Sequence, residues 1–323
     1  MKVLMITSAY PTKEYPFRGK FIQIQEELLK ERGIDVQIFF FRGHKNPIKY
    51  LRSWFQVRKK LKDHDFDFLH AQFGQSAILA LPKKKPLIIS FRGTDLNGYI
   101  SKNGKEGIKS KILTGLSRYV SKKADQVVVV SEGLSKKLPS SVKYHIIPTG
   151  LNFSIFRPLD KMESRKHLGL PLDKKIIFFP SNPDKPIKRY NLALKAIELY
   201  NEENDALLIS AGSILFEQMV YYFNAADALL FTSSREGSPN AIKEALACNL
   251  PIVSVNVGDI QDRLKNISGC YLSLNDSPEE LCKGLTEVLS NSDDFDGRKH
   301  VKSLDNDIVT KQLINIYKTL KKH

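Results

Sequence analysis

The sequence predicts an α/β protein of two domains, each built on a parallel sheet wrapped by helices. Its 323 residues exceed the roughly 150 that one domain usually holds, so two packed cores are expected. Short β-rich runs alternate with amphipathic helical stretches from end to end, which is typical of parallel sheets. This alternation runs twice, and the loop IIPTGLNFSIFRPL separates the halves because its prolines and glycine break regular structure.

The expected strands are short runs rich in β-branched and aromatic residues. In the first half they cover residues 3–7, 36–40, 68–71, 87–91, 126–130 and 144–147. In the second half they cover residues 176–180, 206–211, 228–232, 252–255 and 270–272. We place the boundary near Arg157, which gives an N-terminal domain of residues 1–157 and a C-terminal domain of 158–305. Apolar residues then recur at helical spacing, so residues 306–323 are expected to form a terminal helix that packs back toward the N-terminal domain.

Composition excludes several classes of protein. Hydrophobic residues make up 42% and charged residues 26%, which argues against a disordered or fibrous chain. No apolar stretch reaches the roughly 18 residues of a membrane-spanning helix, and the opening MKVLMITSAYP is interpreted as a first strand rather than a signal peptide. The three cysteines, Cys248, Cys270 and Cys282, are odd in number and scattered, which predicts no disulfide framework and a reducing, cytoplasmic compartment.

The net charge of +15 is concentrated in the first half of the chain. Residues 1–150 contain 28 Lys and Arg against 12 Asp and Glu, a balance of +16, which leaves −1 for residues 151–323. The first half is therefore expected to meet an anionic partner, either lipid, nucleic acid, or an acidic or phosphate-linked substrate. No recognised nucleic-acid-binding module accompanies the charge, so nucleic acid is not expected.

Two basic segments, residues 48–62 and 107–123, also carry apolar side chains. In the first, Ile48, Leu51 and Phe55 fall at helical spacing, close to the only tryptophan of the chain. We favour a helix packed on a sheet with a solvated basic face over an interfacial membrane helix. A packed helix can still present its lysines to anionic lipid, at about 1 kcal/mol each.

Fingerprints of the common cofactor sites are missing. No loop matches that of the P-loop nucleoside triphosphatases, and no G-x-G-x-x-G follows a strand, which argues against a nicotinamide or flavin enzyme. The acidic stretch Asp63, His64, Asp65 and Asp67 with His70 could be considered as a metal site. We instead expect these acids to solvate the edge of a strand, and we expect neither a metal nor a cofactor.

The segment ADALLFTSSREGSPNAIKEALACNLPIVSVNVGD, residues 226–259, predicts strand, loop, helix, turn and strand. Ser238 and Pro239 are expected to be the cap and the first residue of the helix. Glu236 precedes them and Glu244 follows Glu236 by about two turns. The loop opens at the carboxyl end of a parallel strand, where ligands of open α/β sheets bind.

The start of this helix could bind a sugar nucleotide. Backbone amides of Ser238, Asn240 and Ala241 would face an anion there, with the helix dipole behind them. A carboxylate accepts two hydroxyls at once, so Glu236 and Glu244 could hold two sugars bridged by phosphate. The alternative is structural: Glu236 would favour the helix dipole and Glu244 would pair with solvent.

This segment resembles the retaining family 4 glycosyltransferases of the B-type (GT-B) architecture, whose E-x7-E signature is matched by Glu236 and Glu244. The resemblance covers nearly the whole chain. It includes MKVLMITSAYP with the loop glycine Gly19, HAQFG at 70–74, FRGTDLN at 91–97, ADQVVVVSEGLSKKL at 124–138 and IIPTGLNFSIFRP at 146–158. It implies an α/β fold of two Rossmann-like domains whose parallel sheets face an interdomain cleft. The segment EGSPNAIKEALACNLPIVSVNVGD is especially similar to bacterial enzymes that build cell-envelope polysaccharide of the teichuronic-acid type.

The resemblance also implies roles for single residues. Glu236 would lie against the donor sugar, Glu244 would hold the ribose, and Lys188 would neutralise the donor diphosphate, an effect of about 3 to 4 kcal/mol. Gly19 would permit close backbone approach to the diphosphate. The catalytic residues so implied are Glu236, Lys188 and Arg92. The donor-binding residues so implied are Gly19, Lys185, Lys188, Arg189, Glu236, Gly237, Ser238, Asn240 and Glu244.

The chain departs from the family pattern at three places. Arg92 stands where the family usually has a histidine that touches the donor sugar, and a guanidinium could still bind hydroxyl or phosphate. The arginine that accompanies the diphosphate lysine is not evident, so Lys185 or Arg189 would substitute for it. Residues 210–227 are short where the family has a strand and helix that help form the base pocket.

The function implied is a retaining, metal-independent transfer of a hexosyl-type sugar from a nucleotide-sugar donor to a cell-envelope polysaccharide or lipid-linked glycan. The basic N-terminal domain would lie on the acceptor side and could contact the inner face of an anionic membrane peripherally. Two alternatives stay open. One is a nucleotide-sugar epimerase of the same general fold, and the other is a catalytically silent protein that uses its basic half on lipid or nucleic acid.

Overall fold

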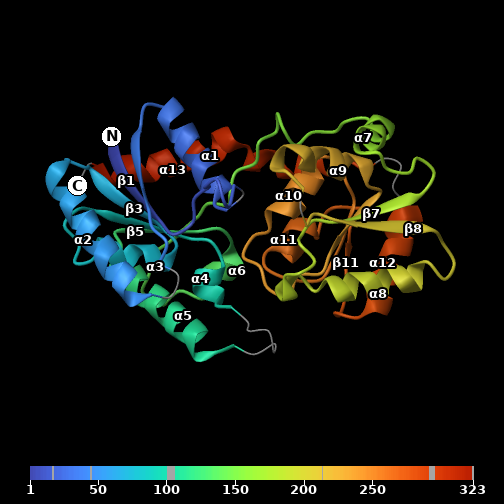
Figure 1. The fold of residues 1–323 in the computed structure, drawn as a ribbon, viewed down its shortest axis with the longest axis horizontal. Coiled ribbons are helices and arrows are strands. Elements are labelled where there is room, and N and C mark those ends of the chain that lie inside the picture. Colours follow the sequence, from blue (N-terminus) through green and yellow to red (C-terminus); the bar gives the residue numbers. More distant parts are fainter. Residues whose placement is uncertain (17, 44–45, 100–105, 213, 291–294, 322–323) are drawn as a thin grey trace. The chain divides into compact units, whose positions relative to one another are not determined.

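The computed structural model describes residues 1–16, 18–43, 46–99, 106–212, 214–290 and 295–321. It divides into two compact domains (Figure 1). The first consists of residues 1–150 with the segment that begins at Asn306, and the second runs from Leu151 to Asp305. The division therefore precedes the boundary predicted at Arg157. The reason is that Leu151 and Phe156 are buried in the core of the second domain, where a linker would leave them in solvent.

The first domain is built on a parallel sheet of the order β2-β1-β3-β4-β5-β6. The strands are β1 (Lys2–Thr7), β2 (Asp35–Phe40), β3 (Phe68–Gln72), β4 (Leu87–Phe91), β5 (Gln126–Val129) and β6 (His145–Ile146). They coincide, to within a residue or two at their ends, with the runs predicted in the first half. Near-continuous apolar runs such as the fully buried β4 are typical of parallel strands covered on both faces.

Helices cover both faces of this sheet (Figure 1). The long helices α1 (Lys20–Glu31) and α13 (Asn306–Lys321) pack into one core cluster. The helices α2 (Pro47–Asp63) and α5 (Ile108–Ser121) pack into the cluster on the opposite face. Shorter elements follow the strands: α3 (Gly74–Ala77), η1 (Ile78–Ala80), α4 (Thr94–Asn97) and α6 (Glu132–Ser135).

The second domain repeats the architecture with a parallel sheet of the order β11-β10-β9-β7-β8. Its strands are β7 (Lys175–Phe179), β8 (Ala206–Ser210), β9 (Ala228–Phe231), β10 (Ile252–Ser254) and β11 (Tyr271–Leu272). One face is covered by α8 (Tyr190–Tyr200) and α12 (Pro278–Ser290). The other is covered by α9 (Met219–Ala225), α10 (Asn240–Ala247), α11 (Ile260–Leu264) and η4 (Arg298–Leu304). The remaining elements are α7 (Lys161–Leu168), η2 (Pro186–Lys188) and η3 (Phe216–Gln218).

Helix α10 begins one residue later than predicted. Its N-cap is Pro239, which is extended at φ −68° and ψ 125° and offers no side-chain cap. The prediction that Ser238 caps this helix is wrong, because the Ser238 hydroxyl donates instead to Asp259 Oδ2 at 2.8 Å. The contact comes from a loop 21 residues further along the chain, which local spacing does not reveal.

No helix within the described ranges is both long enough and apolar enough to cross a bilayer. The three cysteines are free thiols, with Cys248 buried and the other two half-buried.

The terminal helix α13 is tied to the first sheet through a buried polar contact. The Tyr317 hydroxyl lies 2.7 Å from His70 Nδ1, and His70 Nε2 lies 2.8 Å from the Ser90 hydroxyl. All three side chains are buried. Burial, and then the charge of Arg92, lower the pKa of His70 to about 3, so the imidazole is neutral and joins two hydroxyls. Both ring nitrogens of His70 are thus within hydrogen-bond distance of a hydroxyl group.

We expect Tyr317→Phe to lower the free energy of unfolding by about 1 to 3 kcal/mol, because it leaves one His70 nitrogen buried without a partner. Urea unfolding followed by circular dichroism measures the change. The matched control is Tyr144→Phe, whose side chain is exposed and whose hydroxyl lies 3.3 Å from Glu132. The control should change stability by less than about 0.5 kcal/mol. Equal effects of the two substitutions would contradict the structural role of the His70 contact.

Candidate functional site

The strand order of the second sheet brings two loops together at its carboxyl edge. The chain adds β8 on one side of β7 and then β9 on the other, so the winding reverses between β7 and β9. Ligands of open α/β sheets bind outside the carboxyl ends of the strands at such a reversal. Lys188 belongs to the connection that follows β7, and Glu236 belongs to the loop that follows β9. The fold therefore places both predicted residues at the point where a ligand is expected.

Lys188 and Glu236 form an ion pair. The Lys188 Nζ lies 2.5 Å from Glu236 Oε1, and the two side chains are only 21% and 18% exposed. The same ammonium group stands 5.6 Å from the centre of the Phe231 ring. Partial exclusion of water strengthens electrostatic interactions, so this pair presents a concentrated positive and a concentrated negative charge side by side.

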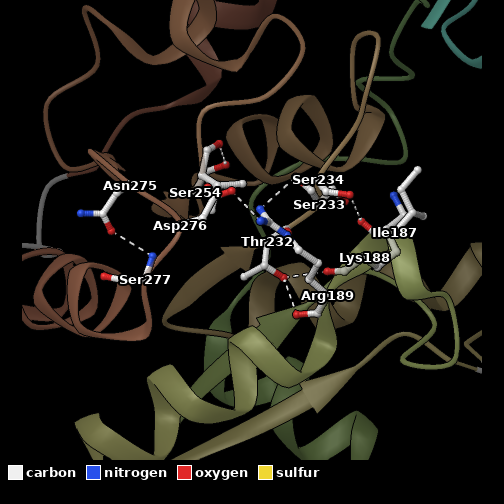
Figure 2. A network of polar contacts seen from close by, with 11 residues as sticks. Ile187, Lys188, Arg189, Thr232, Ser233, Ser234, Ser254, Asn275, Asp276 and Ser277 are labelled. Atoms are coloured by element: carbon white, nitrogen blue, oxygen red, sulfur yellow. Dashed lines mark hydrogen bonds and ion pairs between the residues drawn. The ribbon is translucent and has the colours of Figure 1, made fainter. Parts of the chain in front are cut away.

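The backbone around Lys188 is tied to the loop after β9, as Figure 2 shows. The Thr232 hydroxyl donates to the Lys188 carbonyl at 2.7 Å. Ser234 donates its backbone N–H to the Ile187 carbonyl at 2.9 Å. These bonds cross between two loops that are more than forty residues apart in the chain. They hold the Lys188 backbone before any ligand is present.

Arg189 joins the same two loops to a third. It adopts a left-handed backbone conformation at φ 52°, and its Nε donates to the Thr232 carbonyl at 2.6 Å. One terminal nitrogen lies 2.5 Å from Asp276 Oδ2, in the loop after β11 (Figure 2). Of the two cations expected to replace the missing arginine, Arg189 is thus engaged with its own domain, whereas Lys185 is exposed at the start of η2.

The loop after β10 contacts the segment that leads into α10. Gly258 has φ 65°, and a Cβ there would come within 3.0 Å of the Gly237 carbonyl. The next residue, Asp259, accepts from the Ser238 hydroxyl and pairs with Arg263 at 2.6 Å. Glycine at 258 therefore allows close approach of this loop to the segment that carries Glu236.

Glu244 lies on α10 and is half-buried. Burial raises the pKa of its carboxyl to about 7, and the neighbouring Lys243 opposes this shift only in part. A carboxyl group that changes charge near neutral pH is unusual, and such groups are concentrated at functional sites. The sequence alone does not reveal this property, because it depends on the packing of α10 against the sheet.

The first sheet contains an equivalent reversal between β1 and β3, and Gly19 lies in the connection after β1. Gly19 has φ 75° and directly precedes α1. A Cβ at this position would meet the Ala9 carbonyl oxygen at 2.5 Å and the Tyr10 nitrogen at 2.8 Å. The backbone of the same loop therefore fills the space around Gly19. Glycine is needed there for this reason as well as for the predicted close approach of a diphosphate.

Arg92 follows β4 in the first domain and is held by neutral oxygens. Its guanidinium donates to Gln72 Oε1 at 3.1 Å, to Gln25 Oε1 at 3.2 Å and to Thr149 Oγ1 at 3.2 Å. The group stands 5.1 Å from the centre of the Phe21 ring. Burial lowers the pKa of Arg92 to about 10, so it remains cationic at neutral pH. Its charge is thus oriented by amide and hydroxyl groups at the carboxyl edge of the first sheet.

The structure groups the predicted residues by domain. The second domain brings together Lys188 and Glu236 in direct contact, and it carries Lys185, Arg189, Gly237, Ser238, Asn240 and Glu244 on the adjoining segments. The first domain carries Gly19 and Arg92 at its own carboxyl edge. Sequence reasoning missed Thr232, Asp259, Asp276 and Gln72, which end or follow strands and hold the predicted residues in place. For Thr232 and Gln72, the available signal was their position at or directly after the end of a predicted strand. Asp259 and Asp276 lie further along their loops and carry no such signal.

Among the described residues, no group of His, Cys, Asp and Glu has the arrangement of a metal site. In the acidic stretch, Asp65 pairs with Lys85 at 2.7 Å, and Asp67 accepts the backbone N–H of Lys2 at 2.7 Å.

Two family models match most of the chain. Residues 2–154 match the model described as Glycosyltransferase Family 4. Residues 193–291 match the model described as Glycosyl transferases group 1. The two matches fall within the first and the second domain respectively, apart from the few residues at 151–154.

Three individual proteins illustrate the similarity. The TuaC protein of Bacillus subtilis, named for teichuronic acid biosynthesis, is 26% identical over 80% of this chain and 82% of its own. The N,N'-diacetylbacillosaminyl-diphospho-undecaprenol alpha-1,3-N-acetylgalactosaminyltransferase of Campylobacter jejuni is 24% identical over 75% and 72%. A crystal structure of Anabaena HepE in complex with UDP-glucose has a TM-score of 0.73 at 15% identity, covering 99% of this chain and all of that one. That last likeness concerns the fold.

We expect Gly19→Ala to destabilise the protein more than Gly33→Ala. Both glycines have positive φ, at 75° and 76°, so both substitutions strain the backbone by about 1 to 2 kcal/mol. Only at Gly19 would the new methyl group collide with backbone, since nothing lies within 4 Å of a Cβ at Gly33. The collision should add about 1 to 3 kcal/mol, measured by urea unfolding. Equal losses of stability would show that the loop gives way to the methyl group.

Proposed function

We propose that this chain, a family 4 glycosyltransferase of the GT-B fold, moves a sugar from a nucleotide donor to a cell-envelope glycan or a lipid-linked acceptor. The transferred sugar would retain its configuration. Support for the acceptor class comes from relatives named for teichuronic acid biosynthesis and for transfer to a diphospho-undecaprenol-linked sugar. Support for the donor class comes from the UDP-glucose bound to a protein of the same fold. The sequence likeness to retaining enzymes supports the stereochemistry.

The observation that carries this proposal is the Lys188–Glu236 pair at the strand reversal of the second domain. Negative charge grows on the leaving diphosphate as the glycosidic bond breaks, and a fixed cation stabilises that charge. Lys188 fits this role because its backbone is held by Thr232 and its ammonium is partly shielded from water. In the absence of a donor, Glu236 balances the lysine charge at 2.5 Å.

Acidic and amide groups around this pair would hold the rest of the donor. Glu236 would accept hydroxyls of the transferred sugar, and Glu244 would accept the two hydroxyls of the ribose. Backbone amides of Gly237, Ser238 and Asn240 would face the diphosphate at the start of α10. The Gly258–Asp259 turn contacts two of these three residues: Gly258 lies close to the Gly237 carbonyl, and Asp259 accepts a hydrogen bond from the Ser238 hydroxyl.

The cationic residues would do the work that a metal ion does in other transferases, and we propose that the reaction needs no metal. Lys185, exposed beside Lys188, would reach the outer phosphate. Arg189 would act by positioning, because its guanidinium ties the loops after β9 and β11. In the first domain, Arg92 after β4 and the backbone at Gly19 after β1 would contribute a cation and N–H donors toward the acceptor.

The acceptor would meet the basic first domain, whose residues 1–150 carry the +16 balance. A lipid-linked acceptor carries phosphate and lies at a membrane surface, so both features suit a cationic partner. We propose peripheral contact with an anionic membrane at its inner face, which is consistent with the cytoplasmic compartment expected from the scattered cysteines.

We expect Lys188→Met to lower kcat by about 10² to 10³-fold, because it removes the cation that stabilises the leaving diphosphate. The donor is first chosen by a thermal-shift screen of uridine, guanosine, adenosine and cytidine diphosphate sugars. The matched control is Lys174→Met, whose exposed lysine pairs with Asp205 at 2.9 Å and should leave kcat unchanged. Unchanged turnover in Lys188→Met would contradict the proposal, and conversion of donor without acceptor would identify an epimerase instead.

We expect donor affinity to rise by up to about tenfold between pH 6 and pH 8. The pKa of Glu244 is raised to about 7, so the carboxylate that accepts the ribose hydroxyls becomes populated over this range. Calorimetric titration in buffers of different ionisation enthalpy should also detect proton release on binding at pH 6. In Glu244→Gln the affinity should be weaker at pH 8 and independent of pH.

The same variant provides a stability test. Burying an ionised carboxylate disfavours the folded wild type as pH rises from 4.5 to 7, so Glu244→Gln should gain stability over wild type across that window. Glu279→Gln, an exposed change on α12, serves as the control for both measurements. A pH profile that is the same in wild type and Glu244→Gln would assign the titration to another group.

A further inference from the structure

Helix α2 exposes three large apolar side chains along one side. Ile48, Leu51 and Phe55 are 75%, 58% and 59% exposed, and their spacing of three and four residues aligns them on one face. They line a surface groove together with Arg52, Gln56 and Lys59. A surface helix of a globular protein normally turns such residues toward the core, so this face is available to something outside the described chain.

The exposure does not result from loose packing of α2. Ser53 and Val57 on its inner side are buried. The Trp54 ring donates its Nε1–H to the Leu81 carbonyl at 2.6 Å, which fixes the helix to the turn after η1. The groove therefore lies on the outer side of an anchored helix.

Helix α5 also exposes large apolar side chains. Ile108 and Ile112, four residues apart, are 77% and 63% exposed. Its inner residue Val120 joins the core cluster that also contains Val57 of α2. The two helices thus cover the same face of the first sheet, as Figure 1 shows, and their outer sides both turn away from it.

The charges of both helices are almost entirely positive. Helix α2 (PIKYLRSWFQVRKKLKD) has six Lys and Arg against one acid, and α5 (IKSKILTGLSRYVS) has three and no acid. Long basic side chains beside exposed apolar ones are the combination found on helices that lie in the membrane interface, where the apolar groups enter the acyl boundary and the cations reach lipid phosphates. An electropositive surface of this kind also repels a second copy of itself.

We infer that the outer faces of α2 and α5 are the surface by which this protein docks on an anionic phospholipid bilayer. Ile48, Leu51, Phe55, Ile108 and Ile112 enter the interface, and Arg52 and Lys59 meet the lipid phosphates. The inference rests on the proposed function only for the reason why the protein would dock: docking would hold the enzyme at the membrane, where a lipid-linked acceptor is presented. Docking itself is independent of donor and acceptor.

Vesicle flotation with the full chain tests this surface. The vesicles contain phosphatidylcholine and phosphatidylglycerol at about 7 to 3, and vesicles of phosphatidylcholine alone are run in parallel. The triple variant Ile48→Ser, Leu51→Ser, Phe55→Ser should lose at least about tenfold in partition coefficient. The control triple is Met162→Ser, Leu172→Ser, Leu215→Ser, whose side chains in the second domain are 42%, 42% and 52% exposed and should leave binding unchanged.

A second variant separates charge from apolar insertion. Arg52→Gln with Lys59→Gln should weaken binding by about fivefold for each cation, and raising the salt concentration should remove most of that difference. Nucleotide-sugar binding in solution should match wild type in every variant, which shows that the fold and the donor site are intact. Failure of the proposed function would instead appear as absent turnover with vesicle binding preserved.

Three results would overturn the inference. They are no binding of wild type to the anionic vesicles, equal binding to both kinds of vesicle, and wild-type binding by the α2 triple variant. If wild type self-associates in solution and the triple variant does not, with neither binding vesicles, the surface is an interface between copies of this chain.

Discussion

The order of the strands in the second sheet is the constraint on which the candidate site depends. Because β7 lies between β8 and β9, the connections after β7 and β9 leave the sheet side by side. Lys188 and Glu236 are 48 residues apart in the chain, and they meet because each is near the end of one of these connections. A different strand order would leave the same residues on separate parts of the sheet edge, and neither charge would have the other to balance it.

Backbone contacts fix this edge before any ligand binds. The Thr232 hydroxyl and the Arg189 guanidinium hold one loop against the other, and Asp276 ties in a third. Such fixed loops are useful for stabilising charge, since a group that is already oriented loses little freedom when the charge develops. Gly19 and Gly258 allow close loop packing in the two domains, each at a position of positive φ. A Cβ at Gly19 would collide with backbone, and a Cβ at Gly258 would make a tight contact with the Gly237 carbonyl.

Charge is divided between the domains in a way that matches their suggested partners. The second domain, residues 151–305, has 18 Lys and Arg against 22 Asp and Glu, a balance of −4. Several of its cations are paired with acids, as in Lys188–Glu236, Arg189–Asp276 and Arg263–Asp259. In the first domain, α2 and α5 carry cations on outer faces that also expose apolar side chains. A paired cation suits a small charged ligand that competes for it, whereas an unbalanced basic face suits an extended anionic surface.

The local elements and the candidate residues could be predicted from the order of the amino acids alone. Every predicted strand is present, and the terminal helix lies at Asn306–Lys321 as expected, because the spacing of apolar residues along the chain indicates which local structure can bury them on one face. The contacts that these residues make depend on how the chain folds. The fold placed Leu151 and Phe156 in the second core, turned Ser238 from a cap into a donor to Asp259, and engaged Arg189 with Thr232. These contacts join segments distant in the chain, and strand order and burial, which create them, leave no periodic trace in the sequence.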